Sequence, residues 1–356
     1  MLNIPVQATT SPKAKPADEN KLGFGKRFTD HMRVMDYELE NGWHDMRIIP
    51  YADFSMDPAS VVFHYGQAIF EGLKCYRGEG GALRLFRPRD NFVRLNESAA
   101  RMSIPTIDPD LALEGLYALL RVESDWVPHS DGASLYIRPT IIATDVGLGV
   151  HASHHYRFFI ILSPSGAYYA EGLAPVRIYV EDEMVRATRG GIGFTKAAAN
   201  YAASLMAGEA AQQKGYAQVL WLDGVERAYI EEVGAMNIMF VMDGKIVTPM
   251  LTGSILSGIT RRSILALASD LGYEVEERRI LMQEVYDAAA EGRLSEAFGT
   301  GTAAVVSPVG ALCWRGQEIT VGDGGIGPVA QKLYDTLTGI QRGNVADAHG
   351  WVVQVP

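Results

Sequence analysis

Residues 189–201 constrain the chain more than any other stretch, because they place a lone lysine between a glycine loop and a run of small residues. Three glycines at 190–193 precede Lys196, and glycine lets the backbone turn tightly and approach a ligand closely. The alanine-rich run 197–211 predicts a packed helix. A lysine here is either a surface charge at a helix start or a Schiff-base amine, since a buried ammonium gives up its proton more readily. The stretch alone leaves both interpretations open.

Two nucleotide-binding motifs would use the same glycines, and neither fits. A P-loop ends in Gly-Lys-Ser/Thr, but this lysine stands between Thr195 and Ala197. The dinucleotide fingerprint G-x-G-x-x-G would place its third glycine on Lys196. A nucleotide site is therefore disfavoured, and a non-catalytic nucleotide-binding module stays a remote alternative.

Composition excludes several other classes of protein. The 356 residues suffice for about two domains, with an ordinary globular balance of 47% hydrophobic and 21% charged residues. The net charge of −10 argues against a nucleic-acid partner. Two cysteines give no disulfide framework and no metal-ligand spacing, so no metal is expected. Without a bilayer-length apolar run or a signal-peptide pattern, we expect a cytoplasmic protein with no membrane partner.

Proline and glycine suggest how the chain is divided. Residues 1–22 are rich in proline, lysine and alanine, which predicts a flexible N-terminal arm. We expect a small α/β domain at 23–164, an interdomain linker at 165–174 and a large cofactor-binding domain at 175–356.

Hydrophobic patterns predict the elements near the candidate site. We expect a strand within 24–32, a strand at 61–65, a helical turn at 66–72, a hairpin of 74–77 with 83–86, a helix at 90–102 and a strand at 133–143. Arg94 lies off the apolar stripe of its helix and three residues from Glu97, which predicts an exposed ion pair. Tyr136 and Arg138 share one face of their strand, which favours a pocket wall.

Three features become informative together. Lys196 is the candidate Schiff-base amine. The helix start at 258–260 and the turn at 299–302 can bind an anion through backbone N–H groups and threonine hydroxyls. Glu232 borders an apolar run, where a carboxylate should either face water or meet a cationic partner. A lysine, a phosphate cradle and a buried carboxylate are what pyridoxal 5'-phosphate requires.

The order of the motifs resembles the branched-chain amino acid aminotransferases, which are pyridoxal-phosphate enzymes of fold type IV in the class IV aminotransferase family. Eight markers carry the resemblance: Phe24-Gly-Lys-Arg-Phe-Thr-Asp-His, Phe70-Glu-Gly-Leu-Lys, Leu85-Phe-Arg-Pro, Tyr136-Ile-Arg-Pro, Lys196 to Tyr201, Gln218-Val-Leu-Trp-Leu, Glu232-Val-Gly and Phe298-Gly-Thr-Gly-Thr. The resemblance implies an α/β (α+β) fold with a smaller N-terminal α/β domain, a larger C-terminal mixed α/β domain and the cofactor between them.

The resemblance also implies a role for each site residue. Lys196 would be the catalytic residue, holding the cofactor as an internal aldimine and moving the substrate proton. The cofactor phosphate would be held by Arg94, Ile259, Thr260 and Thr302, the phenolic oxygen by Tyr201 and the ring nitrogen by Glu232. The substrate side chain would meet Phe24, Tyr65, Phe70, Tyr136 and Tyr168, with Arg138 at a distal carboxylate and the backbone at Ala303 near the α-carboxylate. This role for Arg94 replaces the exposed ion pair.

The implied reaction is reversible transfer of the amino group of L-leucine, L-isoleucine or L-valine to 2-oxoglutarate, giving L-glutamate by way of pyridoxamine phosphate. In the family, Tyr65 and the loop 147–150 reach the neighbouring subunit's site, which implies a homodimer. A D-amino acid aminotransferase or an aminodeoxychorismate lyase of the same fold stays the alternative. Some relatives carry a redox Cys-x-x-Cys, whereas residues 304–307 here read Ala-Val-Val-Ser, so no thiol switch is expected.

Overall fold

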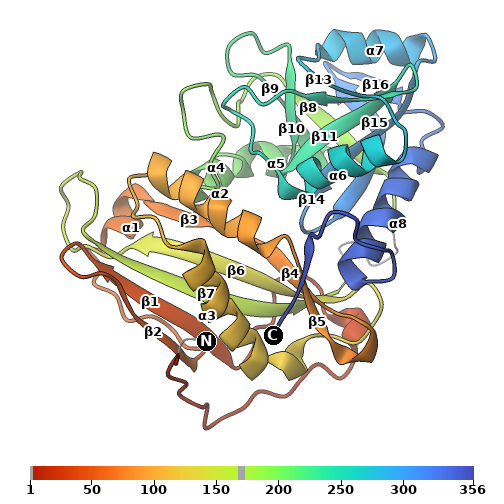
Figure 1. The fold of residues 1–356 in the computed structure, drawn as a ribbon. Coiled ribbons are helices and arrows are strands. Elements are labelled where there is room, and N and C mark those ends of the chain that lie inside the picture. The colour runs from red at the N-terminus through yellow and green to blue at the C-terminus, as the bar shows by residue number, and fades with distance from the viewer. Residues whose placement is uncertain (1–2, 167–172) are drawn as a thin grey trace. The chain divides into compact units, whose positions relative to one another are not determined.

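The computed structural model describes residues 3–166 and 173–356, and its contacts divide the chain into two compact units (Figure 1). The first unit comprises Met1–Ala170, Thr195–Ala199 and Ile340–Pro356, and the second comprises Glu171–Phe194 and Asn200–Gly339. The expected division into an arm, two domains and a linker at 165–174 differs from these units, since two later segments join the first one. Most of that linker lies outside the described residues, and the expected division remains a prediction.

The first unit is built on one eight-stranded sheet in which every pairing is antiparallel. Its order is β17-β5-β4-β6-β7-β1-β2, with β3 paired to β6. The strands are β1 (His31–Glu38), β2 (Gly42–Pro50), β3 (Ala68–Phe70), β4 (Leu73–Arg77), β5 (Leu83–Phe86), β6 (Ser134–Ala143), β7 (His155–Ser165) and β17 (Val352–Gln354). The predicted hairpin of 74–77 with 83–86 and the predicted strand at 133–143 are confirmed.

Two helices lie side by side over this sheet, α2 (Pro88–Arg101) and α3 (Pro109–Val122) (Figure 1). Each begins with a proline, which suits a position whose N–H has no helical partner. Phe92, Leu95 and Ala99 of α2 are fully buried. The predicted helix at 90–102 and its apolar stripe are therefore confirmed.

The stretch 61–72 differs from its prediction in both halves. Residues Val61–Tyr65 form the short helix α1, not a strand, and the expected helical turn contains the strand β3. Gly66 ends α1 in the left-handed conformation, with φ of 59°, and its N–H donates to Val62 O. Tertiary pairing of β3 with β6 outweighs the local preferences of the sequence.

The N-terminal part of the first unit also departs from the expected strand at 24–32. Strand β1 begins only at His31, because Gly23 and Gly25 have positive φ values that interrupt an extended chain. Residues of the expected arm make backbone contacts with β2: Gln7 N donates to Ile48 O at 2.9 Å, and Ile48 N donates to Pro5 O at 2.9 Å.

The second unit holds a nine-stranded mixed sheet that closes on itself. Its order is β10-β9-β8-β15-β14-β11-β12-β13, with β16 beside β15. Because β10 also pairs with β11, six strands complete a barrel. The strands are β8 (Val176–Glu181), β9 (Gln218–Leu222), β10 (Ile230–Val233), β11 (Met236–Met242), β12 (Lys245–Pro249), β13 (Val275–Arg278), β14 (Leu294–Gly301), β15 (Val305–Trp314) and β16 (Gln317–Thr320).

Helices and loops complete the second unit. They include α5 (Leu205–Gln213), α6 (Ile259–Asp270) and α7 (Met282–Ala290), while α4 (Ala198–Ala202) and α8 (Pro328–Arg342) have residues in both units. The single helix expected at 197–211 is broken, because the Ser204 hydroxyl donates to Tyr201 O at 2.7 Å and competes with the helical bonds. None of the helices among residues 3–166 and 173–356 has the length and apolar character of a membrane span.

Candidate functional site

The aromatic ring of Phe70, at the end of β3, has two cationic side chains over it. Lys196 Nζ lies 5.0 Å from the ring centroid, and Arg138 Cζ lies 4.7 Å from it. Arg138 comes from β6, which pairs with β3, so sheet register positions the arginine. The first unit thus brings the predicted catalytic lysine and the predicted carboxylate-binding arginine to one ring.

The backbone of Lys196 is fixed from both sides. Its N–H donates to Ser98 Oγ of α2 at 2.9 Å, and its carbonyl accepts from Phe70 N at 3.1 Å. Ala197 forms a β-bridge with Ile69. The side chain of Lys196 therefore starts from an ordered backbone.

Aromatic side chains form a wall around the Arg138 guanidinium, and the substrate pocket expected beside it remains a prediction. Its guanidinium lies 5.3 Å from the Tyr136 ring centroid, and Nη2 donates to the Tyr136 hydroxyl at 3.3 Å. Phe24 packs edge-on against Tyr136, with centroids 4.8 Å apart. A Cβ at Gly72 would come within 2.1 Å of the Tyr136 hydroxyl, so glycine is required for this wall.

Arg94 is buried, and the predicted exposed ion pair is wrong. Its Nε and Nη2 donate to the two carboxylate oxygens of Glu71, each at 2.8 Å. Asn91 Nδ2 donates to Glu71 Oε2 at 2.8 Å. Burial acts to raise the pKa of Glu71, but the Arg94 charge and these hydrogen bonds outweigh it, so that pKa lies below its usual range. Glu71 therefore orients Arg94, whose contact with phosphate remains a prediction.

Two other predicted pocket residues, Tyr65 and Tyr168, have no described contact with the cluster around Phe70. Tyr65 is 43% exposed, and its hydroxyl donates to Leu148 O. Leu148 and Val150 in the same loop are more exposed still. Tyr168 lies outside the described residues.

In the second unit, three polar residues stand directly opposite one another across β10, β11 and β14. Glu232 pairs with Asn237, and Asn237 pairs with Thr300. Glu232 Oε1 accepts from Leu256 N at 2.7 Å, and Asn237 Nδ2 donates to Leu256 O at 2.9 Å. Thr300 Oγ1 is buried and has no hydrogen-bond partner among the described residues. An orphaned buried hydroxyl in the same row as a buried carboxylate fits a polar ligand.

The start of α6 fits an anion. Gly258, which precedes the helix, offers no side-chain cap, and the first helical amides have no partner within a helix. A Cβ at Gly258 would come within 2.1 Å of Asn237 Oδ1. Helix α6 packs against β14, and the turn after β14 carries Thr302 and Ala303. The predicted residues Ile259, Thr260, Thr302 and Ala303 are thus brought to neighbouring elements, in a form that suits a phosphate group.

Tyr201 lies near the end of α4, where its carbonyl accepts from Ser204. Sequence reasoning found it only through the family resemblance. Sequence reasoning missed the residues that hold the site: Glu71, Ser98, Arg186 and Asn237. Of these, Glu71 lies within the quoted motif Phe70-Glu-Gly-Leu-Lys and Asn237 lies three residues after Glu232-Val-Gly, which is the one signal that could have found them.

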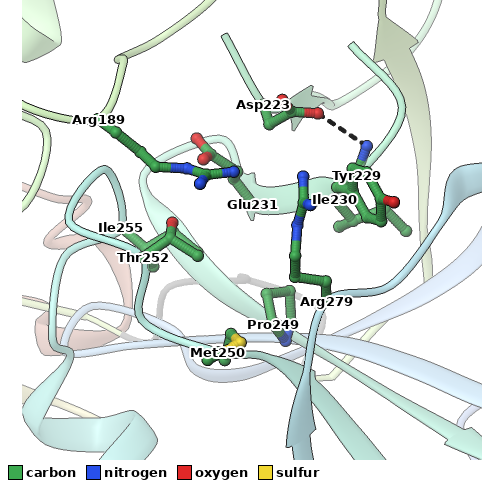
Figure 2. Close-up of a pocket in the computed structure, with 10 residues that line it drawn as sticks. All are labelled: Arg189, Asp223, Tyr229, Ile230, Glu231, Pro249, Met250, Thr252, Ile255 and Arg279. Carbon is green, nitrogen blue, oxygen red and sulfur yellow. Dashed lines mark hydrogen bonds between the residues drawn. The ribbon is translucent and has the colours of Figure 1, made fainter. Parts of the chain in front are cut away.

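A pocket in the second unit has a different lining from the predicted site (Figure 2). It is lined by Arg189, Asp223, Tyr229, Ile230, Glu231, Pro249, Met250, Thr252, Ile255 and Arg279. Figure 2 shows one dashed hydrogen bond, from Tyr229 N to Asp223, at 2.9 Å. The Asp223 carboxylate accepts from four backbone N–H groups, which orders the loop at 223–229 between the paired strands β9 and β10.

Comparison with known proteins gives consistent matches. Residues 68–312 match the family model described as amino-transferase class IV. The chain is similar to branched-chain-amino-acid aminotransferase 2 of Bacillus subtilis (strain 168), with 56% identity over 352 residues, covering 99% of this chain and 97% of that relative.

The chain is also similar to solved structures of branched-chain amino acid aminotransferases. A branched-chain amino acid aminotransferase from Escherichia coli has 31% identity and a TM-score of 0.78, over 91% of this chain and 99% of that one. A T.th. branched-chain amino acid aminotransferase has 28% identity over 90% of this chain and 98% of that one. It was solved with pyridoxamine 5'-phosphate (TM-score 0.76) and with N-(5'-phosphopyridoxyl)-L-glutamate (TM-score 0.75).

Proposed function

Because this chain belongs to the class IV aminotransferases, we propose that it is a branched-chain amino acid aminotransferase that uses pyridoxal 5'-phosphate. It exchanges the amino group of L-leucine, L-isoleucine or L-valine with 2-oxoglutarate. The observation that carries the proposal is the placement of Lys196 and Arg138 over the one ring of Phe70. The Lys196 amine, which would attach the cofactor, and the Arg138 guanidinium, which would bind a substrate carboxylate, can therefore act on the same substrate molecule.

The residues of each unit fit the cofactor. When bound, pyridoxal phosphate acts as an electron sink for the substrate Cα. Lys196 would hold it covalently and carry the Cα proton, and Glu232 would face the ring nitrogen and keep it protonated. The α6 N-terminus with Thr260 and Thr302 would hold the phosphate, and the family resemblance assigns a phosphate contact to Arg94 as well.

The pocket wall explains how one enzyme takes two kinds of side chain. Phe24, Phe70 and Tyr136 offer apolar surface to a branched aliphatic chain. Arg138 lies against two aromatic rings, where its charge is stabilised and remains available to a distal carboxylate. Support comes from the T.th. relative, whose complex with N-(5'-phosphopyridoxyl)-L-glutamate joins the cofactor to the acidic substrate.

The proposal includes a homodimer. Tyr65 carries its hydroxyl to Leu148 O, and the apolar residues Phe63, Leu148 and Val150 are more than half exposed. Exposed apolar side chains of this kind favour burial against a second copy of the chain. Tyr65 would then line the partner's substrate pocket.

Borohydride reduction followed by peptide mapping tests the attachment. We expect a phosphopyridoxyl mass on the peptide that contains Lys196, and none in Lys196→Ala. Lys74 is the matched control, because burial, followed by the nearby Arg342 charge, lowers the pKa of its amine to about 7. A label on Lys74, or normal turnover by Lys196→Ala, contradicts the proposal.

A panel of amino donors with 2-oxoglutarate tests the substrate. We expect turnover with leucine, isoleucine and valine, and Arg138→Met should raise KM for 2-oxoglutarate far more than KM for leucine. Activity with D-alanine and none with leucine assigns the chain to the D-amino acid branch of the same fold.

A further inference from the structure

Arg186 connects three segments of the second unit that contain, or directly precede, residues assigned to the cofactor. Its side chain is 7% exposed. Nη2 donates to the carbonyl of Gly193 at 3.2 Å and to the carbonyl of Ser254. Nε lies 3.2 Å from Glu232 Oε2. One buried guanidinium thus reaches the glycine loop before Lys196, the loop before α6 and the carboxylate assigned to the ring nitrogen.

Both loops are shaped for this contact. A Cβ at Gly193 would lie 2.4 Å from Ser254 O, the atom to which Arg186 donates, and 2.4 Å from Ala187 Cβ. Leu256 N donates to Glu232 Oε1, so the loop that Arg186 holds at Ser254 also holds Glu232 from its other oxygen. The carboxylate is fixed between Arg186 and Leu256.

The neighbouring carboxylate, Glu231, has different partners from those of Glu232. Glu231 is buried and accepts from the Ser254 hydroxyl, while its Oε2 has no hydrogen-bond partner among the described residues. Burial raises the pKa of Glu231, helped by the charge of Glu232 and opposed by Ser254 and Arg186. Two adjacent buried carboxylates do not both ionise easily, and the ion-pair contact with Arg186 is to Glu232.

We infer that Arg186 is a positioning residue that aligns Glu232 for the cofactor ring nitrogen through an ion pair, while fixing the loops before Lys196 and before α6. The inference rests on the proposed function. It adds that Arg186, which no sequence motif assigned to the cofactor, positions Glu232, the residue assigned to the ring nitrogen.

The test compares Arg186→Lys and Arg186→Met with Arg189→Met. Arg189 is exposed, lies three residues further along the same segment and has no hydrogen-bond or ion-pair partner among the described residues. Lysine keeps a positive charge but not the planar fork that reaches two carbonyls and a carboxylate together. Each purified protein is measured for cofactor dissociation constant, kcat, KM for leucine, the visible absorbance band across pH and the melting temperature.

We expect Arg186→Met to weaken cofactor binding by about 10- to 100-fold, as removal of an orienting partner does in other sites. We also expect kcat to fall by a similar factor with KM for leucine nearly unchanged, and the pH midpoint of the absorbance band to move. Arg186→Lys should have a cofactor affinity and a kcat between those of Arg186→Met and wild type. Arg189→Met should match wild type in both.

Two outcomes overturn the inference. In one, Arg186→Met has a lowered melting temperature but wild-type kcat, cofactor affinity and absorbance profile. That result would mean that Arg186 has a structural role alone. The other is the same loss in Arg189→Met. If Arg186→Met does not fold, Arg186→Lys decides by the same measurements. Failure of the wild-type chain to bind the cofactor or transfer amino groups refutes the proposed function instead.

Discussion

Glu71 and Arg94 form a two-point ion pair in which both hydrogen bonds measure 2.8 Å and neither side chain is more than 6% exposed. Removing one partner of such a pair leaves a buried charge uncompensated, which costs about 3–5 kcal/mol. We therefore expect Glu71→Ala to lower the free energy of unfolding at pH 7 by about that amount. Glu97→Gln on the same helix, at an exposed position, is the control and should change it by less than about 0.5 kcal/mol. Urea unfolding measures both.

The same pair predicts a pH dependence. Because the pKa of Glu71 is lowered in the folded protein, its contribution is present above the unfolded value near 4.5 and is lost as pH falls through the lower folded value. The stability of Glu71→Gln should therefore fall less steeply than that of wild type below about pH 4.5. Parallel curves for the two proteins between pH 5 and pH 3 contradict this prediction.

Arg33 should be replaceable with a gain in stability. It is fully buried on β1, its Nε and Nη1 have no hydrogen-bond partner among the described residues, and Nη2 donates to Met35 Sδ at 3.5 Å, a weak acceptor. Arg33→Met removes a desolvated charge and should stabilise the protein by about 1–4 kcal/mol. Burial lowers the pKa of Arg33 to about 9, so the advantage of the variant should shrink as pH rises above that value. A lower melting temperature for the variant at pH 7 contradicts the prediction.

Alanine in place of two glycines should weaken cofactor binding at one position and raise protein stability at the other. At Gly258, φ is −63° and alanine fits the backbone, but its Cβ would meet Asn237 Oδ1 at 2.1 Å. Gly258→Ala should therefore weaken cofactor binding by about tenfold or more, as a loss of about 1.4 kcal/mol at the α6 start implies. Gly208→Ala in α5 meets no atom within 4 Å and should instead stabilise the protein by about 0.5–1 kcal/mol. Equilibrium dialysis and thermal melting separate the two effects.

The cysteines should be inert in the folded protein. Both Cys75 and Cys313 are buried and unpaired. Burial raises the pKa of the Cys75 thiol to about 12, so the reactive thiolate is scarce. A thiol-specific reagent at pH 8 should label neither residue in the native protein and both in denaturant. Fast labelling of the native protein, accompanied by a change in activity, contradicts the expectation of no thiol switch.

The sequence singled out candidate site residues but not the residues that position them. Lys196, Glu232 and the α6 start stand in local patterns of glycine and charge, which short-range physics can interpret. Glu71 could not be assigned to Arg94 in the same way, because their contact depends on how α2 packs beside the end of β3. The error at 61–72 has the same origin, since pairing of β3 with β6 decides that conformation and lies some 70 residues away in the chain.

Closure of the six-strand barrel has a consequence for the precision of the site. Glu232 and Asn237 form the pair that joins β10 to β11, where the ring closes. In an open sheet, an end strand can slide by a residue and turn every side chain to the other face. Strand β10 is held on both edges, by β9 and by β11, so Glu232 cannot shift along its neighbours unless ladders on two sides break together.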